Sequence, residues 1–194
     1  MPRDIIINQS KQTFIDALLR LLKHETFDQV TVQQLVLESG YSRRTYYRYF
    51  GQKEAILDAM FLANLANYHQ YLLAAPLISE KISELLITFL WPKRQTLQLL
   101  ARQDLLIPLT ARHMDKIVTT IQSVAVPWRN NQGVNSKSDK LALIYSIGGF
   151  CTLIDILFKD TLPNSPQEIS EPLQSALIKL IKTTKKRDGV THPF

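Results

Sequence analysis

Hydrophobic residues recur along most of the chain at intervals of three or four positions, the spacing that places side chains on one face of an α-helix. Phe14, Leu18 and Leu22 follow this pattern and predict a first helix over residues 10–25. No alternation of polar and apolar positions lasts long enough to predict a strand. We therefore expect an all-α fold.

Two short helices follow, and each has a capping residue at its start. Thr31-Val-Gln-Gln34 matches the capping box, in which the first and last side chains satisfy each other's backbone amides. Gly40 suits the left-handed conformation that ends many helices. Ser42 can cap the next helix, over residues 43–49. Two helices joined by so short a turn have the spacing of a helix-turn-helix.

Prolines and a polar loop separate the remaining predicted helices. The pattern places these helices over residues 53–73, 79–91, 93–103, 109–124, 138–159 and 167–182. Prolines are expected at the joints, because proline disrupts a helix interior; they stand at positions 92, 108, 127, 163 and 166. A loop is expected around residues 130–133. We interpret residues 1–55 as a three-helix helix-turn-helix domain and residues 56–194 as a larger helical domain.

The composition agrees with a globular helical protein, because 45% of the 194 residues are hydrophobic and only 6 are glycine. The formal net charge of +6 suits a polyanionic partner but is also common in other soluble proteins. Cys151, the single cysteine, can form neither an internal disulfide nor a paired zinc site, which fits a reducing compartment. The N-terminal apolar stretch is too short for a signal peptide, so we expect a cytoplasmic protein.

One apolar segment, residues 141–158, has the length and composition of a membrane span. It contains Asp155 and the pair Gly148-Gly149. An acidic residue inside a span costs about 2.5–3.5 kcal/mol at the span's centre. We therefore expect a buried helix or a subunit interface here, and no contact with a membrane.

Basic and aromatic residues concentrate between Tyr41 and Lys53, a stretch without any acidic residue. Arg44 and Arg48 lie four positions apart and share a helical face, with Arg43 beside them. The planar fork of arginine can bond the O6 and N7 atoms of guanine together. The second helix of the pair is therefore a candidate for the major groove of DNA.

The same stretch contains residues that are expected to face inward or to meet a phosphate. Tyr46 and Phe50 are four positions apart and are expected to turn toward Leu35 and the first helix. Lys53, in the first turn of its helix, opposes the helix dipole by about 0.3–1 kcal/mol. A bound phosphate would reverse that penalty, and Glu54 could equally offset it.

The segment from Phe14 to Leu57 resembles the N-terminal domain of TetR-type transcriptional regulators. The matching features are Phe-x-x-x-Thr-Val from Phe27, the glycine of the turn, Ser-x-x-Thr-x-Tyr-x-Tyr-Phe, and the Lys-Glu pair that follows. The resemblance implies an all-helical homodimer that binds a palindromic operator in double-stranded DNA, with repression as the family default.

The resemblance also assigns roles to individual positions. It implies base reading by Gln33, Arg43, Arg44 and Arg48. It implies phosphate contacts by Thr31, Thr45, Tyr47, Tyr49 and Lys53. Arg44 stands where the family usually has a small residue, which suggests an extra contact with a base or a phosphate. Whether Arg43 or Arg44 is the main reader stays open.

The second domain resembles the C-terminal domain of Gram-positive members at Tyr145–Gly149, Ile154–Lys159 and Leu162–Glu168. This similarity implies that the last two long helices, about 138–182, form a four-helix bundle with their mates in the dimer. Gly148, Gly149 and Cys151 would suit close helix approach, or they are plain small core residues.

Family members commonly bind a small-molecule effector in this domain. The aromatic and polar residues that could line such a pocket are Tyr68, Tyr71, Phe89, Trp91, His113, Met114 and Trp128. The alternative is an activator or regulator without a pocket, controlled by a partner protein that docks on the C-terminal helices.

An enzyme is not expected. The 4 histidines are scattered, and no HxxxH, HExxH or GxSxG element occurs. Asp104, Asp155 and His113 could meet in space, but lone histidines are usually structural. We expect no cofactor and no metal.

Overall fold

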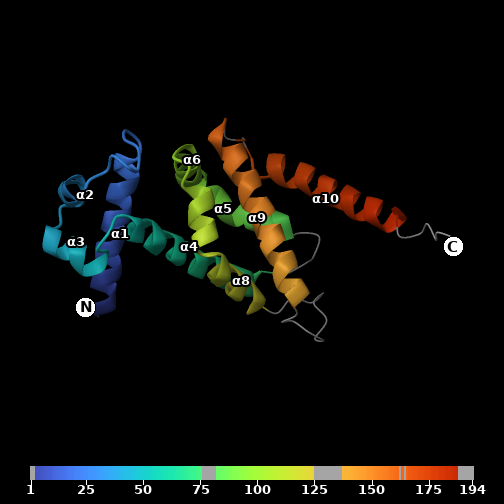
Figure 1. Ribbon diagram of the computed structural model, residues 1–194, viewed down its shortest axis with the longest axis horizontal. Coiled ribbons are helices and arrows are strands. Elements are labelled where there is room, and N and C mark those ends of the chain that lie inside the picture. Colours follow the sequence, from blue (N-terminus) through green and yellow to red (C-terminus); the bar gives the residue numbers. More distant parts are fainter. Residues whose placement is uncertain (1–2, 76–81, 125–136, 162, 164, 188–194) are drawn as a thin grey trace.

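The computed structural model describes residues 3–75, 82–124, 137–161, 163 and 165–187. Across these ranges the chain is helical and contains no strand, which confirms the all-α fold. The molecule is elongated, with α1 to α3 at one end and α10 at the other (Figure 1). Pro127, Trp128 and the predicted loop at 130–133 lie outside the described residues.

The N-terminal unit consists of α1 (Arg3–Leu21), α2 (Val32–Ser39) and α3 (Arg43–Tyr49). The predicted capping box is confirmed, because the Gln34 amide donates to Thr31 Oγ1 at 3.2 Å and the Thr31 amide donates to Gln34 Oε1 at 2.8 Å. Gly40 ends α2 with a φ of 70°, and Ser42 caps α3 by accepting from the Thr45 amide. The helix-turn-helix therefore follows from side chains within a few positions of each helix end.

Helix α4 (Glu54–Ala74) leaves this unit and runs toward the remaining helices (Figure 1). Gly51 makes the turn before it with a φ of 73°. In its first two turns Ile56, Leu57 and Met60 are buried in the same core as Phe14. The start of α4 therefore packs as part of the N-terminal unit, and the predicted boundary after residue 55 falls inside this helix.

The remaining helices form the second, larger part of the molecule. They are α5 (Ile82–Leu90), the short 3-10 helix η2 (Trp91–Lys93), α6 (Arg94–Arg102), α7 (Leu106–Arg112), α8 (Met114–Gln122), α9 (Lys137–Lys159) and α10 (Gln167–Arg187). The single helix predicted over 109–124 is wrong, because the chain breaks at His113 into α7 and α8. Pro108 lies in the first turn of α7 rather than at a joint, a position where proline costs little.

Two hydrophobic cores share α6. The N-terminal core gathers around Phe14 and Leu18 and extends to Leu100 of α6. The second core lies among α5, α6, α9 and α10 and includes Ala101. Because Leu100 and Ala101 are adjacent and both buried, the end of α6 lies between the two cores.

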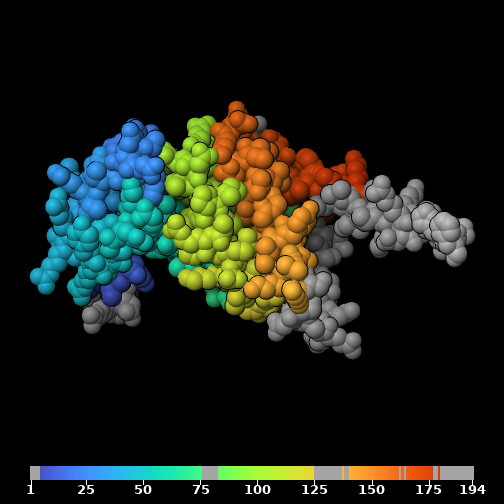
Figure 2. Space-filling model, viewed as in Figure 1, coloured from blue at the N-terminus to red at the C-terminus, as the bar shows by residue number. Residues whose placement is uncertain are grey.

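Helix α9 is long and apolar but mostly not buried within the described chain. By length and composition its segment Lys140–Lys159 could cross a membrane, with a mean hydropathy of 2.0, and 22% of it is buried. Five of its exposed positions follow helical spacing, namely Leu141, Tyr145, Gly149, Thr152 and Ile156. Figure 2 shows α9, in orange, at the molecular surface. We call these five positions the α9 stripe.

Candidate nucleic-acid interface

The helix α3 rests on an aromatic base. The Phe14 ring of α1 contacts Tyr41, Tyr46 and Phe50, with ring centroids 5.5, 5.8 and 5.5 Å apart. Tyr46 is fully buried and Phe50 is buried, which confirms that both turn inward. Because the rings interlock at the stacked and edge-on distances that aromatic pairs favour, the orientation of α3 on α1 is fixed.

The opposite face of α3 is basic and open to solvent. Arg43, Arg44 and Arg48 are exposed, and Tyr47 beside them is 58% exposed. The helix contains no acidic residue. This face therefore presents three guanidinium groups on a rigid support, with nothing in the helix to neutralise them.

The other predicted contact residues lie at the ends of α2 and α3. Thr31 and Gln33 are exposed at the start of α2, while Thr45 and Tyr49 of α3 are half-buried. The Thr45 hydroxyl lies 3.0 Å from Ser42 Oγ, and the Arg48 guanidinium lies 5.9 Å from the Tyr49 ring centroid. Thr31 thus caps α2, and the Thr45 hydroxyl pairs with the Ser42 side chain that caps α3.

Lys53, a predicted phosphate contact, bonds to the backbone of its own chain. It is the N-cap of α4, and its Nζ donates to the carbonyl oxygens of Phe27, Asp28 and Val30 at 2.7, 3.0 and 3.2 Å. The ammonium also lies 4.7 Å from the Phe27 ring centroid. An ammonium has three donors, and here all three meet carbonyls. Lys53 therefore ties α4 to the loop between α1 and α2.

Gln103, at the end of α6, is a residue that sequence reasoning missed. Its Nε2 donates to the carbonyl oxygens of Leu22 and Glu25, both at 3.1 Å, and its Oε1 accepts from the Phe27 amide at 3.2 Å. These partners lie more than seventy positions earlier in the chain. No local sequence signal could have revealed this contact.

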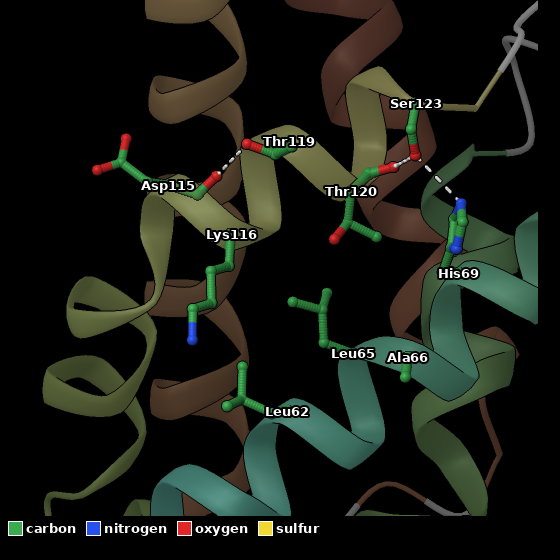
Figure 3. Close-up of a pocket in the computed structure, with 9 residues that line it drawn as sticks. All are labelled: Leu62, Leu65, Ala66, His69, Asp115, Lys116, Thr119, Thr120 and Ser123. Carbon is green, nitrogen blue, oxygen red and sulfur yellow. Dashed lines mark hydrogen bonds between the residues drawn. The ribbon is translucent and has the colours of Figure 1, made fainter.

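An open groove lies between α4 and α8, with a volume of about 540 Å³ (Figure 3). Leu62 and Leu65 of α4 point into it, as does Lys116 of α8. At one end Ser123 Oγ lies 3.1 Å from His69 Nε2 and bridges the two helices. The full lining is Leu62, Leu65, Ala66, His69, Asp115, Lys116, Thr119, Thr120 and Ser123.

None of the described residues predicted for an effector pocket lines this groove, and Trp128 lies outside the described residues. Tyr68 and Tyr71 pack against Phe89, at centroid distances of 5.0 and 5.4 Å, and burial raises the pKa of Tyr68. Trp91 lies under the Arg94 guanidinium at 5.1 Å. Tyr68, Tyr71 and Phe89 thus pack together, whereas Trp91 pairs with Arg94.

His113 and Met114 stand at the junction of α7 and α8. The His113 ring is buried, stacks on Phe61 at 4.9 Å, and places Nε2 at 2.8 Å from Asp58 Oδ1. Asp104 and Asp155 do come together, joined by Lys159 at 2.6 and 2.9 Å. Asp104, Asp155 and His113 therefore divide between two contacts: His113 pairs with Asp58, whereas Asp104 and Asp155 share Lys159.

Comparison with known proteins finds similarity in the N-terminal unit. Residues 14–60 match the family model described as bacterial regulatory proteins, tetR family. The tetracycline repressor protein class D of Escherichia coli is 35% identical over 66 residues, which are 34% of this chain and 30% of that protein. The tetracycline repressor protein class H of Photobacterium damsela subsp. piscicida matches with the same identity and coverage.

The chain thus covers under a third of the length of these two relatives. Comparison with solved structures gave no significant match. The segment matched by the family model contains α2, α3 and their aromatic base, so this unit is similar to the N-terminal domain of tetR-family regulatory proteins.

Proposed function

We propose that the chain is a TetR-type transcriptional regulator that binds double-stranded operator DNA as a homodimer and represses transcription. The observation that carries the proposal is the exposed face of α3, where Arg43, Arg44 and Arg48 project from a buried aromatic base. A rigid basic helix of this width fits the major groove of B-DNA. With this function, the protein is expected in the cytoplasm, bound to the nucleoid.

Within this proposal the side chains divide by chemistry. Arg43, Arg44, Arg48 and Gln33 read base edges, because guanidinium and amide groups can bond a base at two atoms. The hydroxyl-bearing residues contact phosphates and set the register of the helix on the duplex, namely Thr31, Thr45, Tyr47 and Tyr49. Lys53 is left out of this set, because its ammonium is occupied by backbone carbonyls.

The proposed dimer forms through α9 and α10, about residues 138–182. Its support is the α9 stripe, whose members recur every three or four residues and include Tyr145 at 84% and Ile156 at 58% exposure. Nothing lies within 4 Å of a Cβ built at Gly149, so a second helix could approach there closely. A symmetric dimer implies a palindromic operator with half-sites about 34–36 Å apart. The resemblance of the C-terminal sequence to Gram-positive members, which implies a four-helix bundle between two subunits, supports the same pairing.

We propose the groove between α4 and α8 as the effector site. Its volume of about 540 Å³ lies within the usual range for small-molecule sites, and an occupant would separate α8 from the helix that begins beside the DNA-binding unit. A small rotation of α4 would change the separation of the two α3 helices and release the DNA.

The groove is open rather than enclosed, and this favours a second candidate: control by a partner protein docking on the C-terminal helices. Hydrogen exchange distinguishes the two modes of control. A small effector would protect the facing turns of α4 and α8, whereas a docked protein would protect a broad surface of the C-terminal helices.

Selection of genomic fragments with the purified protein tests the proposal and returns the operator. On that operator, Arg44→Ala should cost about 1–3 kcal/mol and relax the preference at one base pair. Arg94→Ala in the second part of the molecule removes the same charge and serves as the matched control. Equal losses of Arg44→Ala on operator and random DNA would make Arg44 a phosphate contact. A protein that enriches no fragment would overturn the proposed function.

A further inference from the structure

We infer that the end of α6 couples the dimer helix α9 to the DNA-binding unit, and that Gln103 is the residue that positions this unit. The inference rests on the proposed function, because it concerns how the two α3 helices of a dimer are held relative to each other. The inference rests on two sets of side-chain hydrogen bonds made by one short segment, residues 98–104. One set reaches the segment after α1, and the other reaches the end of α9.

The first set holds the DNA-binding unit. Helix α1 ends at Leu21, and the carbonyls that follow a helix end need partners from elsewhere. Gln103 supplies them for Leu22 and Glu25, and it also accepts from the Phe27 amide. Its amide group is thus used on both its donor and acceptor sides. The Gln103 side chain, at the end of α6, thus satisfies three backbone groups in the segment that follows α1.

This contact continues toward the helix-turn-helix. The Glu25 carboxylate accepts from Gln34 Nε2 at 2.8 and 2.7 Å. Gln34 is also the residue that closes the capping box with Thr31 at the start of α2. The segment that Gln103 holds therefore bonds directly to the helix that precedes α3.

The second set holds the end of α9. Gln98 Nε2 donates to the Asp160 carbonyl at 2.8 Å, and Arg102 Nε donates to the Lys159 carbonyl at 3.2 Å. The Lys159 ammonium in turn lies 2.6 Å from Asp104 Oδ1. Asp104 has a φ of 56°, a left-handed conformation that costs energy for a residue other than glycine. Its ion pair with α9 helps to hold this turn, next to Gln103.

Three elements of the described chain connect the DNA-binding unit to the rest of the subunit. The first is α4, which is continuous with the unit, and the second is α7, whose Leu109 is buried in the N-terminal core. The third is the end of α6, where Leu100 packs in the N-terminal core and Ala101 in the second core. Because the end of α6 also bonds the end of α9, it sets the angle between α3 and α9, and with it the separation of the two α3 helices in a dimer.

The experiment compares binding to the selected operator, to the same half-sites with one base pair inserted or removed between them, and to a single half-site. Wild type should discriminate against both altered spacings. Gln103→Leu removes the hydrogen bonds at similar size and should reduce this discrimination by at least about tenfold, with half-site affinity unchanged. Gln95→Leu, at an exposed position of the same helix, is the matched control and should behave as wild type.

A second variant acts on the α9 side of the same segment. Arg102→Met removes the Arg102 bonds to the α9 end, leaves those of Gln98 and Asp104, and does not touch α1. It should also reduce spacing discrimination, and it keeps the test open should Gln103→Leu fail to fold. Folded variants that discriminate as wild type does would overturn the inference, as would an equal loss on operator and half-site. A wild-type protein that selects no DNA would instead refute the proposed function itself.

Discussion

The two ends of the molecule differ in how far their apolar side chains are buried within the described chain. In the N-terminal unit Phe14, Tyr46 and Phe50 close a core, and Thr31 and Ser42 cap the helices around it. In the C-terminal part α9 leaves the apolar stripe from Leu141 to Ile156 in solvent. In the first region the helix caps and the aromatic contacts come from neighbouring residues, whereas in the second region α9 presents apolar side chains that the rest of the described chain leaves exposed.

The largest effect is expected when a charge is placed in the α9 stripe. Tyr145→Glu should raise the dissociation constant of the dimer by at least about 100-fold, because a buried interfacial carboxylate without a partner is costly. Sedimentation equilibrium measures the change, and circular dichroism checks that the helices remain. Leu37→Glu is the matched control, since Leu37 on α2 is 83% exposed, against 84% for Tyr145, and lies outside the stripe. A dimer that survives Tyr145→Glu would place the interface elsewhere.

A second substitution tests whether the N-terminal unit is held by its own contacts. Lys53→Ala removes three hydrogen bonds from a charged donor and should lower the free energy of unfolding by about 1.5–3 kcal/mol, as measured by urea denaturation. Lys23→Ala, at an exposed position after α1, should change it by no more than about 0.5 kcal/mol.

The salt dependence of DNA binding separates the two roles considered for Lys53. A structural tie predicts an unchanged slope of log affinity against log salt. A fall of about one unit in that slope would restore Lys53 as a phosphate contact.

The smallest expected effect is a gain in stability inside the aromatic base. Within the described chain the Tyr46 hydroxyl is buried and has no hydrogen-bond partner, so Tyr46→Phe should raise the free energy of unfolding by about 1 kcal/mol. Tyr47→Phe, at a side chain that is 58% exposed, is the control and should be near neutral. A destabilised Tyr46→Phe variant would mean that the hydroxyl does have a partner.

The pH dependence of unfolding is a second test of the buried Tyr46 hydroxyl. Burial raises the pKa of Tyr46 above its ordinary value of 10.0, so the folded state holds this proton more tightly than the unfolded state. The wild-type protein should therefore lose stability as the pH rises from about 10 through the folded pKa. Tyr46→Phe should lose less over that interval, and denaturation at successive pH values measures the difference.

The parts that could be predicted from the sequence are those decided within a few positions. The capping box of Thr31 and Gln34, the left-handed Gly40 and the inward turn of Tyr46 all depend on residues three or four apart. The Gln103 contacts join residues more than seventy positions apart, and the Lys53 ammonium reaches carbonyls whose positions depend on the folded loop. No periodic pattern contains that information.

The second part of the molecule was harder to predict for a different reason. Periodicity identifies an apolar helix but does not say whether its face meets the same chain, another chain or a ligand. It predicted α9 correctly as a helix, yet left open whether the helix was buried or at an interface. The aromatic residues chosen for a pocket, such as Tyr68 and Phe89, contact each other, and the groove is lined by smaller side chains nearby.

The uncovered surface of α9 has a consequence for the cell as well as for the fold. If two chains must meet before either can grip DNA on both half-sites, the amount of active protein rises with the square of subunit abundance while subunits are scarce. A modest change in the rate of synthesis or of proteolysis would then be amplified in operator occupancy. A protein with the proposed function would then respond to its own abundance.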